Sequence, residues 1–182
     1  MKKWILLILL VLFILPAAEA GYGLFGTYWD SKNYEDMYGI GLRLGSQIYS
    51  GVGVEARVSY VSTDLLGDPD VEMDVLPLEA LALWTIDLTT LLKPYIGAGI
   101  GYYMKNPQWK SNDLGGSIEA NDSFGYFGIA GFNFLLGNAK FFGEAKYNLI
   151  SEDDTLDWRG TGVEEKYSLD GLSINAGIVF GF

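Results

Sequence analysis

The stretch Leu172-Ser-Ile-Asn-Ala-Gly-Ile-Val-Phe-Gly-Phe182 alternates between large apolar residues and small or polar ones. A period of two is typical of a β-strand, because successive side chains of a strand point to opposite faces. The apolar face carries Leu172, Ile174, Ala176, Ile178, Phe180 and Phe182, and the other face is mostly Ser, Asn and Gly. Such an apolar face has to be covered, either by another layer of the protein or by lipid.

The same alternation recurs in earlier parts of the chain. Seven segments show it: 22–29, 38–45, 52–60, 76–84, 93–102, 124–134 and 141–149. The connections alternate in length: 47–51, 87–92 and 137–138 are short, and 30–37, 63–74, 105–123 and 151–170 are long. Short turns at one end and long loops at the other are typical of bacterial transmembrane barrels. We therefore predict an all-β fold, an eight-stranded antiparallel up-and-down transmembrane β-barrel whose termini face the periplasm.

The first twenty residues differ from the rest. Lys2 and Lys3 precede an apolar block over residues 4–15, and Ala18-Glu19-Ala20 follows. This is the three-part pattern of a cleavable secretory signal peptide with an Ala-x-Ala site. The sequence predicts a signal peptide over residues 1–20 and one outer-membrane barrel domain over residues 21–182.

The composition of the second strand face indicates which side meets lipid. A soluble ligand-binding barrel also alternates, but it turns its apolar face inward. A face exposed to water would carry many Lys, Glu and Thr and few glycines, because Gly weakens a strand. Here that face is rich in Gly, Ser and Asn, which suits a narrow closed lumen. We place the Val, Leu, Ile and aromatic rows against lipid, and a soluble periplasmic ligand-binding barrel is the alternative.

Aromatic residues on the apolar face gather near both strand ends. Near the tight turns are Trp84, Phe132, Phe134, Phe141, Phe180 and Phe182, and near the long connections are Tyr28, Tyr38, Tyr60, Tyr102, Phe124 and Tyr126. Two aromatic girdles mark the two interfaces of a membrane. Charge also differs between the ends, because the long connections sum to a formal charge of −13 and the rest of the predicted mature chain to +1.

A few charged residues fall on the face assigned to the lumen. They are Arg43, Glu55, Arg57, Glu79, Glu144 and Lys146. Charges in a tight lumen must pair, so we predict a network that plugs the barrel, with a gate or a polar conduction path as the alternative. Pro77 interrupts the pattern of its strand, and a closed barrel should place it at a bulge or a strand start.

The segment Lys93-Pro-Tyr-Ile-Gly-Ala-Gly-Ile-Gly-Tyr102, the Gly-rich strands and the terminal Ile178-Val-Phe-Gly-Phe182 resemble small Gram-negative outer-membrane β-barrel proteins, the OmpA-barrel and OmpX-like group. The resemblance covers residues 21–182. It implies that the terminal strand, with Phe180 and Phe182, is the signal read by the outer-membrane assembly machinery. It also implies insertion into the outer membrane from the periplasm.

Catalysis is poorly supported by the residue types present. The chain has no histidine and no cysteine, and barrel enzymes of this compartment rely on His for proton transfer or nucleophile activation. The acidic clusters fit no ordered calcium loop, so we expect no metal site and no cofactor. The net charge of −11 argues against nucleic-acid binding.

We therefore expect a non-catalytic outer-membrane protein that acts structurally or by surface contact through four long acidic extracellular loops. Its expected partners are outer-membrane lipid, lipopolysaccharide, the assembly machinery and a surface ligand of unidentified nature. A narrow, porin-like channel for small or hydrophobic solutes is the rival function.

Overall fold

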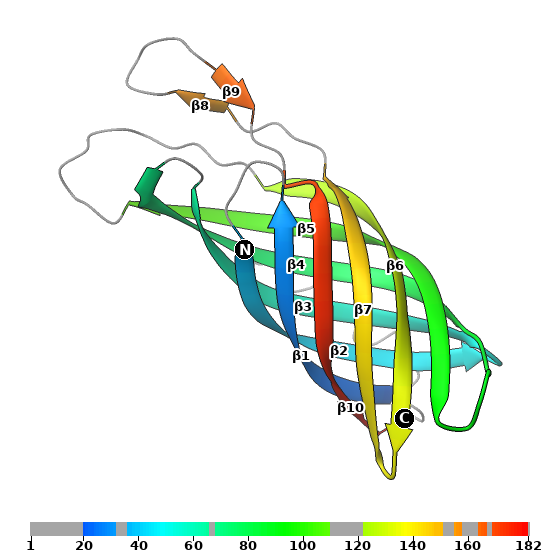
Figure 1. Cartoon of the computed structure of the whole chain (residues 1–182). Helices are drawn as coiled ribbons and strands as arrows, with labels where there is room; N and C mark the ends of the chain where they lie inside the picture. The colour runs from blue at the N-terminus through cyan, green and yellow to red at the C-terminus, as the bar shows by residue number, and fades with distance from the viewer. Residues whose placement is uncertain are drawn as a thin grey trace.

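The computed structural model describes residues 20–31, 36–65, 68–109, 122–150, 155–157, 164–166 and 169–181. Eight antiparallel strands close into a barrel in the spatial order β1-β10-β7-β6-β5-β4-β3-β2 (Figure 1). The barrel strands are β1 (Ala20–Ser31), β2 (Met37–Tyr49), β3 (Val52–Leu65), β4 (Asp68–Thr85), β5 (Leu92–Trp109), β6 (Ser123–Leu136), β7 (Ala139–Ile150) and β10 (Gly171–Phe180). The predicted fold class is confirmed.

The strand register fixes the width of the barrel. One circuit follows the paired residues Ala20, Ser46, Val54, Ala82, Ala98, Gly128, Tyr147, Leu172 and Asp30. The path leaves β1 at Ala20 and returns to it at Asp30, a stagger of ten residues. A stagger of this size over eight strands corresponds to strands tilted by about 40° and an interior that side chains can fill.

The alternation of each strand sorts its side chains as predicted. Outward residues are exposed, such as Ile40 at 73% and Leu24 at 59%, whereas their inward neighbours Gly41 and Phe25 are buried. Described rings of the predicted girdles also point outward, among them Tyr38 and Tyr126 near the long connections and Trp84 and Phe132 near the tight turns. The apolar rows thus face away from the lumen, which is opposite to a ligand-binding barrel.

Strand pairing reaches further than the predicted boundaries. Residues 63–74 were expected to form a long loop, but β3 and β4 pair as far as Leu65 and Asp68, with a register shift between Asp64 and Leu65. The prediction of a loop here is wrong, because polar residues beyond the apolar band still form the backbone ladder. A small separate sheet, β8 (Thr155–Asp157) with β9 (Glu164–Lys166), lies in the last long connection (Figure 1).

Pro77 lies within β4, and its predicted placement at a bulge or strand start is wrong. Its partner on β5 is Tyr103. On the β3 side, the pairing steps from Val58↔Leu78 directly to Val61↔Val75 without a change of register. Proline lacks the N–H that the ladder needs, so the strand loses pairing locally but keeps its alignment.

Tight turns close the other end of the barrel. Gly137, in the two-residue turn between β6 and β7, has a positive φ of 61°, which glycine adopts without strain. No helix in the described ranges is long and apolar enough to cross a membrane. The predicted signal peptide, apart from Ala20, and the terminal Phe182 lie outside the described residues, so the domain boundary remains a prediction.

Candidate functional site in the lumen

A cross-lumen salt-bridge cluster lies at mid-height in the barrel. Arg57 on β3 is at its centre. Its Nη2 donates to Glu144 Oε2 on β7 at 3.0 Å, and its Nε donates to Glu55 Oε2 at 3.1 Å. One guanidinium therefore joins two carboxylates, one on its own strand and one on the opposite wall of the barrel.

The remaining predicted charges complete this cluster, which we call the charge belt. Arg43 Nη2 also donates to Glu55, on the oxygen that Arg57 does not use. Lys146 donates to Glu79. The structure thus brings together all six charged residues that the sequence placed in the lumen. Each of these side chains is at most 10% exposed, so little of their surface meets water or lipid.

Several uncharged belt partners were not predicted. Tyr95 donates its hydroxyl to Glu144 Oε2 at 2.6 Å, and Asn175 Nδ2 donates to Glu144 Oε1 at 2.8 Å. The Arg43 guanidinium also lies 4.1 Å from the centre of the Phe142 ring, a cation–π distance. The alternation of their strands places Tyr95 and Asn175 on the inward face, and this feature of the sequence could have identified them as belt partners.

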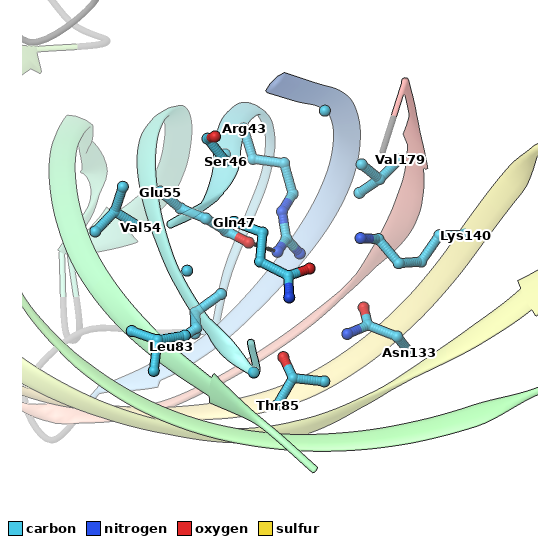
Figure 2. Close-up of a pocket in the computed structure, with 15 residues that line it drawn as sticks. Arg43, Ser46, Gln47, Val54, Glu55, Leu83, Thr85, Asn133, Lys140 and Val179 are labelled. Atoms are coloured by element: carbon cyan, nitrogen blue, oxygen red, sulfur yellow. Dashed lines mark hydrogen bonds and ion pairs between the residues drawn. The ribbon is translucent and has the colours of Figure 1, made fainter. Parts of the chain in front are cut away.

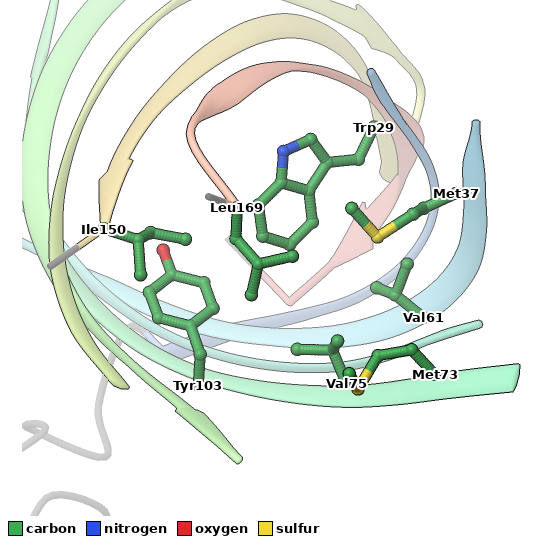
Figure 3. Close-up of a cluster of buried hydrophobic side chains, with 8 residues drawn as sticks. All are labelled: Trp29, Met37, Val61, Met73, Val75, Tyr103, Ile150 and Leu169. Atoms are coloured by element: carbon green, nitrogen blue, oxygen red, sulfur yellow. The ribbon is translucent and has the colours of Figure 1, made fainter. Parts of the chain in front are cut away.

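The lumen also contains apolar layers, and the predicted lining of mostly small and charged residues is incomplete. One cluster fills the end near the long connections (Figure 3). Its members are Trp29, Met37, Val61, Met73, Val75, Tyr103, Ile150 and Leu169. We call it the loop-end cluster. None of these side chains is more than 5% exposed, so this end of the described lumen is filled.

Two smaller apolar clusters pack beside the charge belt. The first contains Leu81, Leu83, Tyr95, Phe127 and Ile129, and the second contains Phe25, Phe142 and Val179. Lys146 Nζ lies 5.2 Å from the centre of the Phe127 ring, and the Arg57 guanidinium lies 6.0 Å from that of Phe25. The belt cations are therefore held between carboxylates and aromatic faces.

The tight-turn end of the lumen contains a cavity of about 120 Å³. Polar residues from β2, β3, β6 and β7 project into it (Figure 2). The charged residues in its lining are Arg43, Glu55 and Lys140. Among the described residues, no group of three or more Asp, Glu, His or Cys side chains is arranged to hold a metal ion.

Sequence comparison matches residues 6–182 to a family model described as the outer membrane protein β-barrel domain. The chain belongs to this family. It is therefore an outer-membrane protein, and its outward apolar rows contact lipid. The alternative of a soluble periplasmic ligand-binding barrel is wrong, as both the family and the outward direction of the apolar side chains show.

Solved structures with the same fold are distant in sequence. OprG, an outer membrane protein from Pseudomonas aeruginosa, has a TM-score of 0.71 and 19% identity, with 92% of this chain and 97% of that chain covered. Neisserial surface protein A has a TM-score of 0.64 and 16% identity, with 90% and 97% covered. The outer membrane protein AlkL has a TM-score of 0.56 and 12% identity, with 92% of both chains covered. No protein of curated function matches the sequence.

Proposed function

We propose that this protein is a non-catalytic outer-membrane barrel that serves as a structural element of the membrane, a surface-contact protein, or both. The observation that carries the proposal is the filling of the lumen. The loop-end cluster occupies one end, and the charge belt joins opposite walls at mid-height through Arg57 and Glu144. An eight-stranded barrel has an interior that side chains just fill, so its outward connections are the parts left to meet a partner.

The long connections support surface contact through their charge. Rigid strands hold loops that recognise partners, which is the common division of labour in proteins. Residues 151–170 carry a formal charge of −5, and the paired extension of β3 and β4 carries the acidic residues Asp68, Asp70, Glu72 and Asp74 beyond the apolar band. We infer a surface ligand with complementary positive charge, with lipid and lipopolysaccharide as neighbours in the membrane.

Orientation is part of this proposal, with the tight turns in the periplasm and the long connections outside the cell. Because the chain has no cysteine, single cysteines report sidedness without background. A membrane-impermeant maleimide added to intact cells should label Thr161→Cys and leave Asn138→Cys unlabelled. Labelling of Asn138→Cys alone would reverse the orientation. Labelling of both after outer-membrane permeabilisation is the control for reactivity.

Planar-bilayer recording tests the plugged lumen against the narrow channel. The belt and the loop-end cluster predict a silent wild-type protein. Steady openings that change in Glu55→Gln or Arg57→Gln would favour the channel, because those variants remove charges that line its path. Folding of each sample is checked by the mobility difference between unheated and boiled protein in gel electrophoresis.

Trimming the long connections separates the two non-catalytic roles. Cells that lack the protein are complemented with the full chain or with a chain in which residues 151–170 are shortened, and uptake of a hydrophobic dye is measured. Restored exclusion of the dye by both chains would indicate a structural role of the barrel itself. Restoration by the full chain alone would show that the connection is required. Failure of the full chain to change uptake would contradict a role in membrane integrity.

The terminal strand is proposed as the assembly signal. Phe180 lies on the outward face of β10, at 38% exposure, and it pairs with Tyr22 at the seam of the barrel. Phe180→Ala with Phe182→Ala should lower the amount of protein that reaches the outer membrane. Urea-unfolded protein of the same variant should still fold into detergent, because spontaneous folding does not use the machinery.

A further inference from the structure

Three polar atoms at the tight-turn end have no hydrogen-bond partner among the residues that the structure describes. They are Nη1 of Arg43, the hydroxyl of Ser46 and Oδ1 of Asn133. All three residues line the cavity, and each is at least nine-tenths buried, with exposures of 5%, 5% and 8%. A buried polar atom without a hydrogen bond costs free energy, so a polar ligand bound in this cavity would gain free energy from any of these atoms that it reaches.

Arg43 is held in position for such a ligand. Its Nη2 is bonded to Glu55, and its guanidinium stacks on Phe142 at 4.1 Å. These contacts fix the plane of the group, which lies among the residues that line the cavity (Figure 2), and Nη1 has no partner among the described residues. Since the guanidinium cannot lose its proton, Nη1 is a permanent donor that favours an anion. The positive Lys140 lines the same cavity, and Glu55 is already shared by two arginines.

The third atom narrows the class of anion. Oδ1 of Asn133 is an acceptor, so an anion that also satisfies this atom must carry a hydrogen-bond donor. Sulfate, carboxylates and phosphate diesters have no O–H group at neutral pH. Phosphate monoesters have largely lost theirs, because their second pKa is about 6. Inorganic phosphate retains one, because both H2PO4⁻ and HPO4²⁻ carry an O–H group at neutral pH. The oxygens of inorganic phosphate accept from Arg43 while its O–H donates to Asn133.

We propose that the tight-turn end of the lumen is a binding site for inorganic phosphate, formed by Arg43, Ser46 and Asn133. The cavity of about 120 Å³ holds a five-atom oxoanion but not a lipid headgroup with its glycerol. This site is independent of the long connections at the other end of the barrel, and it does not depend on the proposed surface role.

The test is a phosphorus NMR titration of the full barrel in a maltoside detergent, which itself contains no phosphorus. Inorganic phosphate should show saturable line broadening with a dissociation constant on the order of 1 mM, as expected for a few hydrogen bonds to a small ligand. Sulfate should displace it at least about tenfold more weakly, because sulfate leaves Asn133 unpaired. Glycerophosphocholine, a soluble diester headgroup, should not compete.

Three variants assign the residues. Arg43→Gln should weaken phosphate binding by about 10- to 100-fold, since it removes the charge-assisted donor. Asn133→Ala should lower the affinity for phosphate to the level of the affinity for sulfate. The affinity for sulfate itself should not change. The matched control is Lys93→Gln, which removes a cation on the same end of the barrel. Lys93 pairs with the exposed Asp87 and does not line the cavity, so binding should be unchanged.

Each outcome decides the proposal, provided that the unheated sample shows the mobility of a folded barrel. Absence of saturable broadening would mean that only water fills the cavity, and the proposal would be overturned. Equal binding of sulfate or of the diester would overturn the role of Asn133 and indicate a general anion or headgroup contact. An unchanged affinity in Arg43→Gln would place the site elsewhere. Retained binding in the Lys93→Gln control, with loss in the other two variants, supports the site.

Discussion

The two ends of the barrel lumen are filled by different kinds of side chain. At the loop end, Trp29, Met37 and Tyr103 are at most 1% exposed and pack into one apolar cluster. At the tight-turn end, polar side chains surround a cavity of about 120 Å³. The charge belt lies between them. One end is therefore packed with apolar side chains, and the other contains a cavity large enough for water or a small solute.

This difference shows that an outer-membrane barrel need not have a uniformly polar interior. Apolar packing at one end contributes stability in the way a soluble core does. The belt then joins opposite walls, and its burial makes each of its charges dependent on its partners. Substitutions at the two ends and in the belt should therefore have different costs, and that ranking can be measured.

The largest effect is expected from breaking the belt. Glu144→Gln removes the carboxylate that accepts from Arg57, Tyr95 and Asn175, and it leaves a buried cation with half of its partners. We expect a loss of about 3 to 5 kcal/mol in the free energy of unfolding. Urea titration of the barrel in lipid vesicles measures it.

The control for that experiment is a surface pair of the same chemistry. Lys93 and Asp87 are joined at 2.7 Å, but their side chains are 33% and 67% exposed. Asp87→Asn should change stability by less than about 0.5 kcal/mol. An equal loss of unfolding free energy in Glu144→Gln and Asp87→Asn would show that the belt stabilises the barrel no more than a surface ion pair does.

Next in size is a truncation that compares the two ends directly. Met37→Ala, in the loop-end cluster at 0% exposure, leaves a void and should cost about 3 kcal/mol. Gln47→Ala, in the lining of the tight-turn cavity, should cost less than about 0.5 kcal/mol. The same urea titration applies, and a similar cost at the two positions would remove the distinction between a packed and an open end.

A pair of glycines tests the inner wall against the outer wall. A Cβ at Gly177 would lie 2.1 Å from the Leu24 carbonyl oxygen and 2.8 Å from Phe25 Cα, whereas a Cβ at Gly128 would meet nothing within 4 Å. Gly177→Ala should therefore destabilise by about 2 kcal/mol through overpacking. Gly128→Ala should be neutral or stabilising by up to about 1 kcal/mol. Tolerance of alanine at Gly177 would mean that the two strands separate easily there.

The smallest effects are expected from single tyrosine hydroxyls. Tyr95→Phe removes a buried donor to Glu144 and should cost about 1.5 kcal/mol. Tyr102 donates at 2.7 Å to Asp122 on the exposed surface, where water replaces the bond, so Tyr102→Phe should cost less than about 0.5 kcal/mol. Thermal unfolding of the two variants in the same detergent compares them, and a larger loss for Tyr102→Phe would reverse the expected order.

Much of this architecture could be predicted from the period of two alone. Lipid and lumen impose opposite requirements on alternate residues, so Ile40 and Gly41 reveal their faces without any structure. The alternation did not predict where strands end, because backbone pairing between strands continues beyond the region in which lipid and lumen constrain the two faces. The pairing of Asp64 with Glu72, beyond the apolar band, is an example.

The lumen was predictable only in part. Charges on the inward face could be assigned because lipid excludes them, and all six lie in the belt. Alternation placed Leu81 and Leu83 on the inward face, but it did not predict that they would pack into an apolar layer with residues of other strands. Which charges meet across the lumen is also hidden, since the contact of Arg57 with Glu144 follows from the tilt and stagger of strands 87 residues apart in the chain.

The pairing of β1 with β10 has a consequence for how this protein is made. Tyr22 lies beside Phe180 in the seam, so the first strand acquires its second neighbour only when the final one arrives. Until then, two rows of unpaired backbone groups would face hydrocarbon, which the membrane does not tolerate. Contacts this distant along the chain form slowly. We therefore expect that a chain cut short before β10 forms no stable structure in the bilayer.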